Sequence, residues 1–145
     1  RSDNTGCNQI DKTASFLTDD LEKAVLLYPN NSPIRYTVAV QYLLLGEKNK
    51  ALEHAKVLAA RDDSYRLPDR TGSDSLIERR SALYLSFLAQ SYLAKAFEIA
   101  WRASEQDYLI IKAMTPDERE ARDVLELFTA MKGVDQNIAV KNPLN

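Results

Sequence analysis

Apolar residues return along this chain at intervals of three or four positions, the period of a helix that buries one face. The first such set precedes Pro29 and consists of Ile10, Ala14, Leu17, Leu21, Ala24 and Tyr28. Pro29 and the two asparagines after it are expected to end this helix. Residues 1–9 are polar and show no period, so they are predicted to form a tail or linker.

Two further helices are predicted between Ser32 and Ala60. Ser32 before Pro33 is a start signal, because serine can cap free backbone amides and proline is tolerated at the first helical position. A helix is therefore expected over residues 33–45, and Gly46 supplies the backbone freedom that its C-terminal cap requires. The next helix, over residues 49–60, carries one apolar side made of Ala51, Leu52, Ala55 and Leu58.

The second half of the chain begins with its longest predicted loop, residues 62–74, which are polar and include a proline and a glycine. Ser75 and Glu78 then have the spacing of a capping box, which marks the start of a helix. No glycine or proline interrupts residues 75–113, so they form either one unusually long helix or two helices. We favour two helices, with a break near residues 93–96.

The last helix has the clearest start signal in the chain. Thr115 stands at the capping position, Pro116 at the first helical position and Glu118 at the third. This helix is expected to run to Lys132 and to end at Gly133. Residues 134–145 are polar and predicted to be a tail, so the predicted domain spans residues 10–133.

The window SPIRYTVAVQYLLLGEKNKALEHAKVLAARDD, residues 32–63, resembles a tetratricopeptide repeat. The small, large and turn positions of that pattern are held by Val38, Ala39, Tyr42, Gly46 and Ala51. Residues 16–31 are similar to the second helix of an earlier repeat, and residues 83–93 to another first helix. The resemblance implies an all-α fold of antiparallel helix hairpins in a right-handed superhelix, with the final helix as a C-terminal cap.

Tetratricopeptide proteins usually bind extended peptides or helices in a groove lined by their first helices. The resemblance places Tyr36, Val40 and Leu43 in this groove, together with Ser86 and Gln90 from the next first helix. The predicted surface is apolar and neutral, and Tyr36 and Val40 replace the lysine and asparagine that clamp a terminal carboxylate in some relatives. Packing inside the core is the competing interpretation of these apolar positions.

Composition and charge argue against two other classes of function, nucleic-acid binding and membrane insertion. The 19 basic and 21 acidic side chains are interspersed, so the basic stripe that nucleic acid requires is missing and we expect no nucleic-acid partner. The most apolar window, residues 82–101, includes Gln90, Lys95 and Glu98, which favours a buried helix over a membrane span. We therefore expect no direct membrane insertion; the composition suits cytoplasm and periplasm equally.

No pattern typical of catalysis or metal binding occurs in the sequence. Cys7 is the only cysteine and His54 the only histidine, and His54 lies outside the apolar stripe, which predicts a surface side chain. Asp62 and Asp63 are expected to be solvated, and Trp101 to pack in the core or between helices. We predict no catalytic residues, no metal, no cofactor and no enzymatic activity.

Two hypotheses of function follow. The first is a non-enzymatic module that binds a partner protein or peptide through the predicted groove. The alternative is a structural end-cap or self-association domain of a larger helical-repeat assembly. In that alternative, a homo-oligomer buries the exposed face of the first helix, which includes Leu17, Leu21 and Ala24.

Overall fold

The computed structural model describes residues 18–66 and 81–134, and within these ranges every regular element is a helix. The first described residues, 18–27, are helical. The chain continues with α2 (Ser32–Leu44), α3 (Lys48–Arg61), α5 (Ala82–Ala89), α6 (Tyr92–Ala103), α7 (Tyr108–Ala113) and α8 (Arg119–Lys132). The predicted all-α class is confirmed. No helix in the described ranges is both long enough and apolar enough to cross a bilayer.

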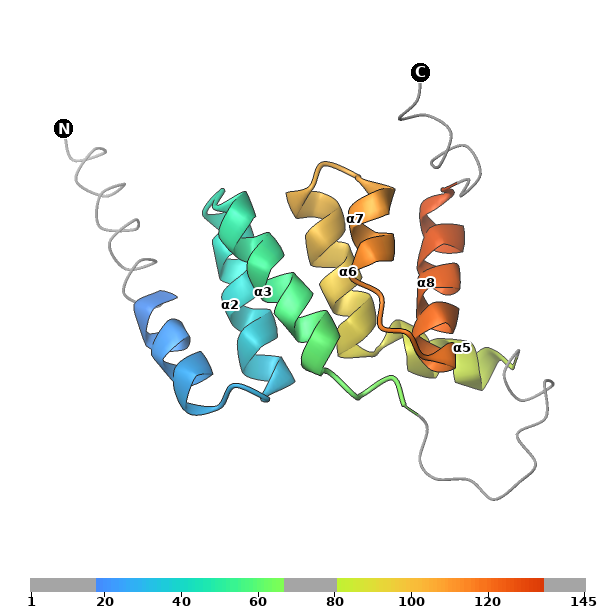
Figure 1. The fold of residues 1–145 in the computed structure, drawn as a ribbon, viewed down its shortest axis with the longest axis horizontal. Helices are drawn as coiled ribbons and strands as arrows, with labels where there is room; N and C mark the ends of the chain where they lie inside the picture. The colour runs from blue at the N-terminus through green and yellow to red at the C-terminus, as the bar shows by residue number, and fades with distance from the viewer. Residues whose placement is uncertain (1–17, 67–80, 135–145) are drawn as a thin grey trace.

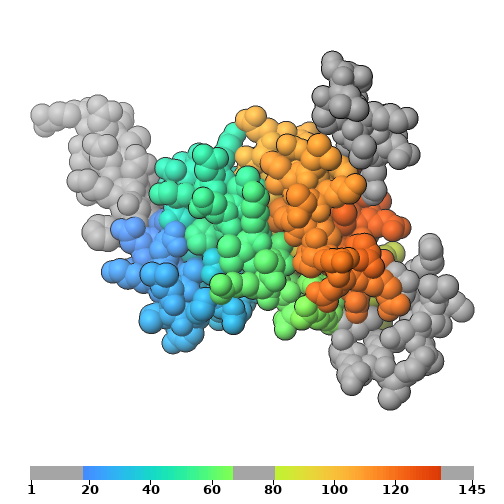
Figure 2. Space-filling model, in the orientation of Figure 1, coloured from blue at the N-terminus to red at the C-terminus, as the bar shows by residue number. Residues whose placement is uncertain are grey.

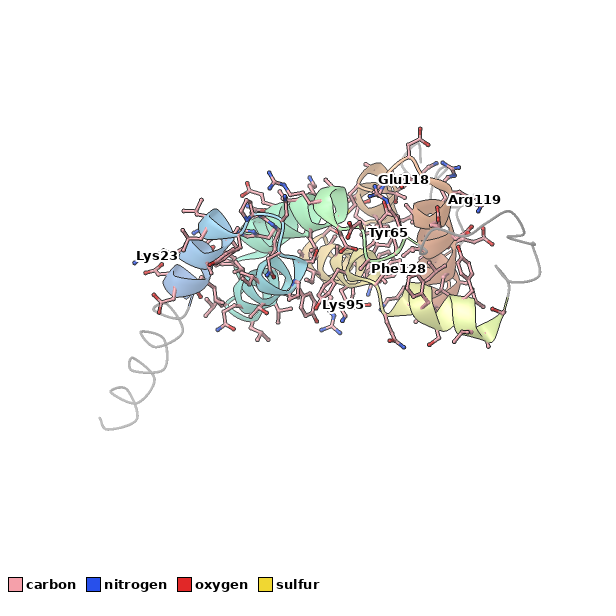
Figure 3. All side chains as sticks on the ribbon, turned by 90° about the horizontal axis from the view of Figure 1, so that it is seen from below. Lys23, Tyr65, Lys95, Glu118, Arg119 and Phe128 are labelled. Carbon is pink, nitrogen blue, oxygen red and sulfur yellow. The ribbon has the colours of Figure 1, made fainter. Side chains whose placement is uncertain are left out.

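Residues 18–27, α2, α3, α6, α7 and α8 stand side by side and alternate in direction, whereas α5 lies across the lower end of this row, as Figure 1 shows. Helices α2 and α3 form an antiparallel hairpin, and α6 packs against both of them. Helices α7 and α8 follow on the other side of α6, and α5 packs on α8. Seen in Figure 3, α2 and α6 form one layer, whereas residues 18–27, α3 and α7 form the other. The surface in Figure 2 runs from residues 18–27 (blue) across α3 (green) to α7 and α8 (orange).

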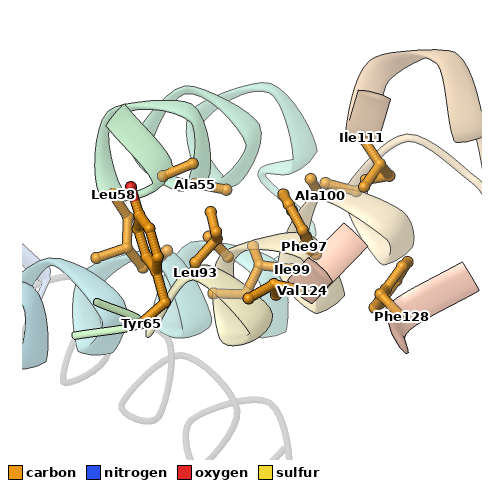
Figure 4. Close-up of a cluster of buried hydrophobic side chains, with 14 of the residues drawn as sticks. Ala55, Leu58, Tyr65, Leu93, Phe97, Ile99, Ala100, Ile111, Val124 and Phe128 are labelled. Atoms are coloured by element: carbon orange, nitrogen blue, oxygen red, sulfur yellow. The ribbon is translucent and has the colours of Figure 1, made fainter. Parts of the chain in front are cut away.

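One continuous core joins these helices, and Figure 4 shows its central part. Its largest fully buried side chains include Leu58, Tyr65, Leu93, Phe97, Ile111 and Val124. Each of them stabilises the fold by about 1.5–3 kcal/mol through removal of apolar surface from water. Fully buried alanines between the larger residues allow close helix contact: Ala39, Ala51, Ala55, Ala59, Ala96 and Ala100. The Trp101 side chain of α6 packs edge-on against Phe128 of α8, with ring centroids 5.7 Å apart.

Helices α2 and α3 agree closely with their predicted ranges, but a different residue caps α2. Asn31 is the N-cap, and its side-chain oxygen accepts from the Ile34 amide at 2.9 Å. Ser32 is instead the first helical residue, so the predicted serine cap is wrong. Gly46 has φ of 78° after the end of α2, and Gly133 has φ of 69° at the end of α8. Both glycines therefore terminate helices as predicted.

Within the described residues the long apolar pattern is split into three helices and not the predicted two, and its first break lies at residues 90–91 and not at 93–96. Ser91 causes the break. Its hydroxyl donates to the Leu88 carbonyl at 2.7 Å and accepts from the Ala94 amide at 3.1 Å. One serine thus closes α5 and caps α6, and no glycine or proline is needed.

A second break after Ala103 contradicts the prediction of uninterrupted helix to residue 113. Glu105 and Gln106 adopt left-handed backbone conformations, with φ of 58° and 68°. Such values are costly for residues other than glycine, and they carried no signal in the sequence. Asp107 then caps α7, because its carboxylate accepts from the Leu109 amide at 3.0 Å.

The predicted cap of the last helix is also wrong. Thr115 donates to the Ile111 carbonyl at 2.8 Å and so closes α7. Glu118 precedes α8 as its N-cap residue, but its carboxylate makes no capping bond. It accepts from the Tyr65 hydroxyl at 2.7 Å and from both Nε and Nη2 of Arg66, so it holds the segment after α3 against α8. Tyr65 and Glu118 lie close together in Figure 3.

Several predicted features lie outside the described residues. These are the tail of residues 1–9, Cys7, the start of the first helix with Ile10, Ala14 and Leu17, and the second half of the loop of residues 62–74. The capping box of Ser75 and Glu78 and residues 135–145 of the predicted tail also lie there.

Candidate functional site

The three α2 residues of the predicted groove lie on one helical face, at spacings of four and three. Tyr36, Val40 and Leu43 are half-buried and pack against the core. Tyr36 meets Tyr92 of α6 edge-on, with ring centroids 5.8 Å apart and planes inclined by 67°. This face therefore continues from α2 onto α6.

Lys95 of α6 lies over both aromatic rings of this face. Its ammonium is 4.7 Å from the centre of the Tyr92 ring and 5.5 Å from that of Tyr36. Contacts of this kind contribute roughly 0.5–1 kcal/mol each at exposed sites. Among the residues that the structure describes, no carboxylate forms an ion pair with Lys95. Figure 3 shows Lys95 on the side of the molecule formed by α2 and α6.

A small hollow opens beside Lys95, between α6, α8 and the end of α5. Its volume is about 160 Å³, and its apolar lining consists of Ala89, Ala94, Val124, Leu127, Phe128 and Met131. Met131 is 68% exposed, so a large apolar side chain stands at the mouth of the hollow. Lys95 lines this hollow and also lies over the Tyr36 ring, so the hollow and the Tyr36 face share this side chain.

The other charged residues of the hollow neutralise one another. Glu98 accepts from Lys132 Nζ at 2.7 Å and from Arg102 Nε at 2.9 Å. Burial of the Glu98 carboxyl opposes its ionisation, but these hydrogen bonds outweigh that effect and lower its pKa. Glu98 is therefore an ionised carboxylate with both oxygens engaged, whereas Lys95 has no carboxylate partner among the described residues.

Ser86 and Gln90 lie elsewhere. Both are exposed on α5 and the residue that ends it, where Gln90 Nε2 donates to Ser86 Oγ at 3.1 Å. The position beside the α2–α3 hairpin belongs to α6, and α5 packs on α8. The structure therefore brings Tyr36, Val40 and Leu43 together with α6, and it places Ser86 and Gln90 on a different helix.

A polar cluster joins residues 18–27 to the α2–α3 hairpin, and His54 is at its centre. The His54 side chain is only 13% exposed, so the predicted surface position is wrong. Its ring stacks on Tyr42 with centroids 5.6 Å apart. Its Nε2 lies 3.2 Å from Glu22, and its Nδ1 lies 3.2 Å from Arg35. No signal in the sequence indicated this position, because the three partners come from two other helical segments, Glu22 from residues 18–27 and Arg35 and Tyr42 from α2.

The hydrogen bonds of this cluster fix the histidine tautomer. Arginine has no acceptor, so Nδ1 of His54 accepts from Arg35 and the ring proton on Nε2 is donated to Glu22. Burial opposes ionisation of Glu22, but hydrogen bonds from Tyr42 and His54 lower its pKa. Burial and the bond to Glu22 raise the pKa of Tyr42. Both ring nitrogens are engaged within the junction, which suits a clamp between helices better than a general base.

Asp62 is the centre of a second buried cluster and is only 3% exposed, so the predicted solvation is wrong. It accepts from Ser32 Oγ at 2.9 Å, from Ser64 Oγ at 2.7 Å and from the Leu93 amide at 3.2 Å. Ser64 Oγ in turn accepts from the Tyr92 amide at 2.9 Å. Asp62 and Ser64 thus cap the start of α6 and orient Tyr92 toward α2.

The sequence analysis missed Tyr92 and Lys95, which lie beside Tyr36, and Leu127 and Met131, which line the hollow. Their spacings were visible, since Tyr92 and Lys95 are three residues apart and Leu127 and Met131 are four apart. The contacts that these residues make depend on the break at Ser91, which rotates the start of α6 relative to α5.

No group of three or more histidine, cysteine, aspartate or glutamate side chains in residues 18–66 and 81–134 is arranged to hold a metal ion.

We name the face formed by Tyr36, Val40 and Leu43 of α2 with Tyr92 and Lys95 of α6 the α2–α6 face. It is the candidate site, with the hollow at its edge. The chain matches no protein-family model, no curated protein and no solved structure. The functional assignment therefore rests on the geometry of this face.

Proposed function

We propose that this protein is a non-enzymatic binding module, and that the α2–α6 face accepts a segment of a partner protein. The observation that carries the proposal is the alignment of half-buried apolar and aromatic side chains of two helices, ending in a hollow with an exposed methionine at its mouth. Such a surface suits an apolar segment, since aromatic residues and methionine are enriched at protein interfaces.

The helix packing supports a tetratricopeptide-like arrangement as part of this proposal. The α2–α3 hairpin turns at Gly46, Ala39 and Ala51 are fully buried, and α6 packs on both helices of the hairpin, as the first helix of a following repeat would. In this arrangement α6 replaces residues 83–93 as the next first helix. Helix α8 then serves as the C-terminal cap of a right-handed superhelix.

The test is selection of ligands from a random peptide library displayed on phage, with the whole chain as bait. The decisive variant is Tyr36→Glu. It removes apolar surface from the centre of the face, and it places a carboxylate near Lys95. We expect selected peptides to bind this variant about tenfold more weakly, the effect typical of a central interface residue.

Tyr28→Glu is the matched control, because Tyr28 is 60% exposed at the end of the first helix. Binding to this variant should equal that of the original chain, and circular dichroism should show unchanged helicity in both variants. Failure to enrich any peptide, or equal binding to all three proteins, would contradict the proposed function.

A second candidate function is self-association at the other end of the helix row. Leu26 and Leu27, 81% and 73% exposed, lie next to the exposed Tyr28. The structural alternative placed the interface at Leu17, Leu21 and Ala24, but Leu21 packs against the core of its own chain. In the revised alternative this apolar edge packs against a second copy instead. Sedimentation equilibrium distinguishes the two: a dimer that Leu26→Lys and Leu27→Lys together convert to monomer supports assembly, and a monomer at all concentrations refutes it.

A further inference from the structure

The hollow between α6 and α8 is suited to one side chain and not to a cofactor. Pockets for small molecules and cofactors usually enclose about 300–1,000 Å³. The hollow encloses about 160 Å³. An apolar cavity of about 150 Å³ is known to take a benzene ring, so this space suits one aromatic ring or one leucine side chain.

The charge around the hollow favours an acidic partner. Two lysines and one glutamate line it, namely Lys95, Lys132 and Glu98. Glu98 is already bound by Lys132 and Arg102, so a basic partner would find no available carboxylate on Glu98 and would be repelled by Lys95. Lys95 has only the two tyrosine rings as partners among the described residues, and its ammonium can still donate hydrogen bonds to an incoming carboxylate.

We propose that the hollow receives a single aromatic or leucine side chain of a partner segment, and that Lys95 binds an aspartate or glutamate beside it. This inference rests on the proposed function and specifies the chemistry of the partner. Lys95 touches both the hollow and the Tyr36 ring, so a segment anchored in the hollow continues along the α2–α6 face. Apolar burial supplies most of the affinity, and the ion pair sets the position of the acidic residue.

The probe is the capped dipeptide N-acetyl-Phe-Asp-amide, which combines one ring with one carboxylate. N-acetyl-Phe-Asn-amide removes the charge at nearly constant shape, and N-acetyl-Ala-Asp-amide removes the ring. Binding is followed by NMR of protein labelled at the methionine methyl groups. The chain has two methionines, and only Met131 lines the hollow, so Met114 at the end of α7 serves as an internal control.

We expect saturable shifts of the Met131 methyl with the Phe-Asp probe and much smaller shifts of Met114. The Phe-Asn probe should bind about two- to five-fold more weakly, the range expected for one partly exposed ion pair. The Ala-Asp probe should give no saturable shift. An unmoved Met131, or equal affinity for all three probes, would overturn the inference.

Two variants separate the ring site from the charge site. Lys95→Gln should make the Phe-Asp and Phe-Asn probes bind equally. Ala94→Leu places a larger side chain in the lining and should abolish binding of both. Ala60→Leu, a matched control at an exposed position of α3, should bind as the original chain does. Unchanged binding to Ala94→Leu or to Lys95→Gln would refute the corresponding half of the proposal.

The outcome is separable from that of the proposed function. If library peptides bind through Tyr36 but are indifferent to Ala94→Leu and Lys95→Gln, partner binding stands and this inference fails. If the dipeptide shifts the Met131 methyl signal but no library peptide depends on Tyr36, the hollow binds an aromatic side chain as proposed, and the assignment of the α2–α6 face as a binding surface is wrong.

Discussion

Asp62, the residue that caps the C-terminal end of α3, accepts a hydrogen bond from the Ser32 hydroxyl at the start of α2, at 2.9 Å. The same carboxylate accepts the Leu93 amide at the start of α6. One buried side chain therefore fixes the ends of three helices that are separate in the sequence. The orientation of the α2–α6 face depends on this junction, because Tyr36 and Tyr92 approach each other from the two helices whose starts it joins.

We predict that Asp62→Ala destabilises the fold by about 2–4 kcal/mol. The loss leaves the Ser32 hydroxyl and the Leu93 amide without a charged acceptor, and each such hydrogen bond contributes about 1.5–3 kcal/mol. Urea unfolding followed by circular dichroism measures the change. Asp63→Ala, at the exposed neighbour, should stay within about 0.5 kcal/mol. A similar effect for both variants would show that the Asp62 network does not stabilise the junction.

Gln106→Gly should stabilise the protein by up to about 1 kcal/mol. Gln106 has φ of 68°, a conformation that costs a side-chain-bearing residue about 1–2 kcal/mol and glycine almost nothing. The greater freedom of glycine in the unfolded chain offsets part of the gain. Gln90→Gly is the control, because Gln90 has φ of −92° and gains nothing from glycine. Thermal unfolding should therefore show a higher Tm for the first variant only.

The sequence predicted the helices whose ends carry conventional signals. Pro33 and Gly46 lie where the pattern required them, so the ranges of α2 and α3 were nearly correct. The breaks at Ser91 and at Glu105 were missed or misplaced for a physical reason. A serine inside an apolar run gives no distinctive local signal, and a left-handed glutamate is tolerated because the surrounding structure determines it.

The candidate site was predictable to the extent that it depends on one helix. Tyr36, Val40 and Leu43 share a face of α2 whatever lies beside them. Their neighbours on the next helix could not be predicted from the sequence. The break between α5 and α6 lies a few residues before the predicted position, so that α6, and not α5, packs against α2. The roles of Asp62 and His54 were missed for a related reason, since each depends on partners from other helical segments.

The Glu118 carboxylate should make stability depend on pH in the acidic range. Hydrogen bonds from Arg66 and Tyr65 lower its pKa in the folded protein below the ordinary value of about 4.3. Its stabilising effect is therefore complete above the pKa of the unfolded chain and is lost as pH falls through the lower folded pKa. Because the side chain is 35% exposed, solvent screening limits the effect to about 1 kcal/mol.

Glu118→Gln tests this dependence by urea unfolding at a series of pH values. The variant should be less stable than the original chain at pH 7, and the difference should shrink as pH falls below about 4. Glu126→Gln removes an exposed carboxylate from the same helix and controls for net charge. A difference that is constant from neutral to acidic pH would mean that ionisation of Glu118 does not contribute.

His54→Ala should loosen the first helix before the rest of the fold. The substitution leaves the buried Arg35 guanidinium without its acceptor on the ring and removes a donor from Glu22, which lies in the first helix. A cost of about 1–3 kcal/mol is expected for these unsatisfied groups. Because Glu22 anchors residues 18–27 to the hairpin, amide hydrogen exchange of this helix should accelerate much more than that of α6.

Lys56→Ala, at an exposed position of α3, should leave both rates unchanged. Equal acceleration in the first helix and α6 would instead mean that His54 stabilises the fold as a whole, and the proposed clamp between two helical segments would be wrong.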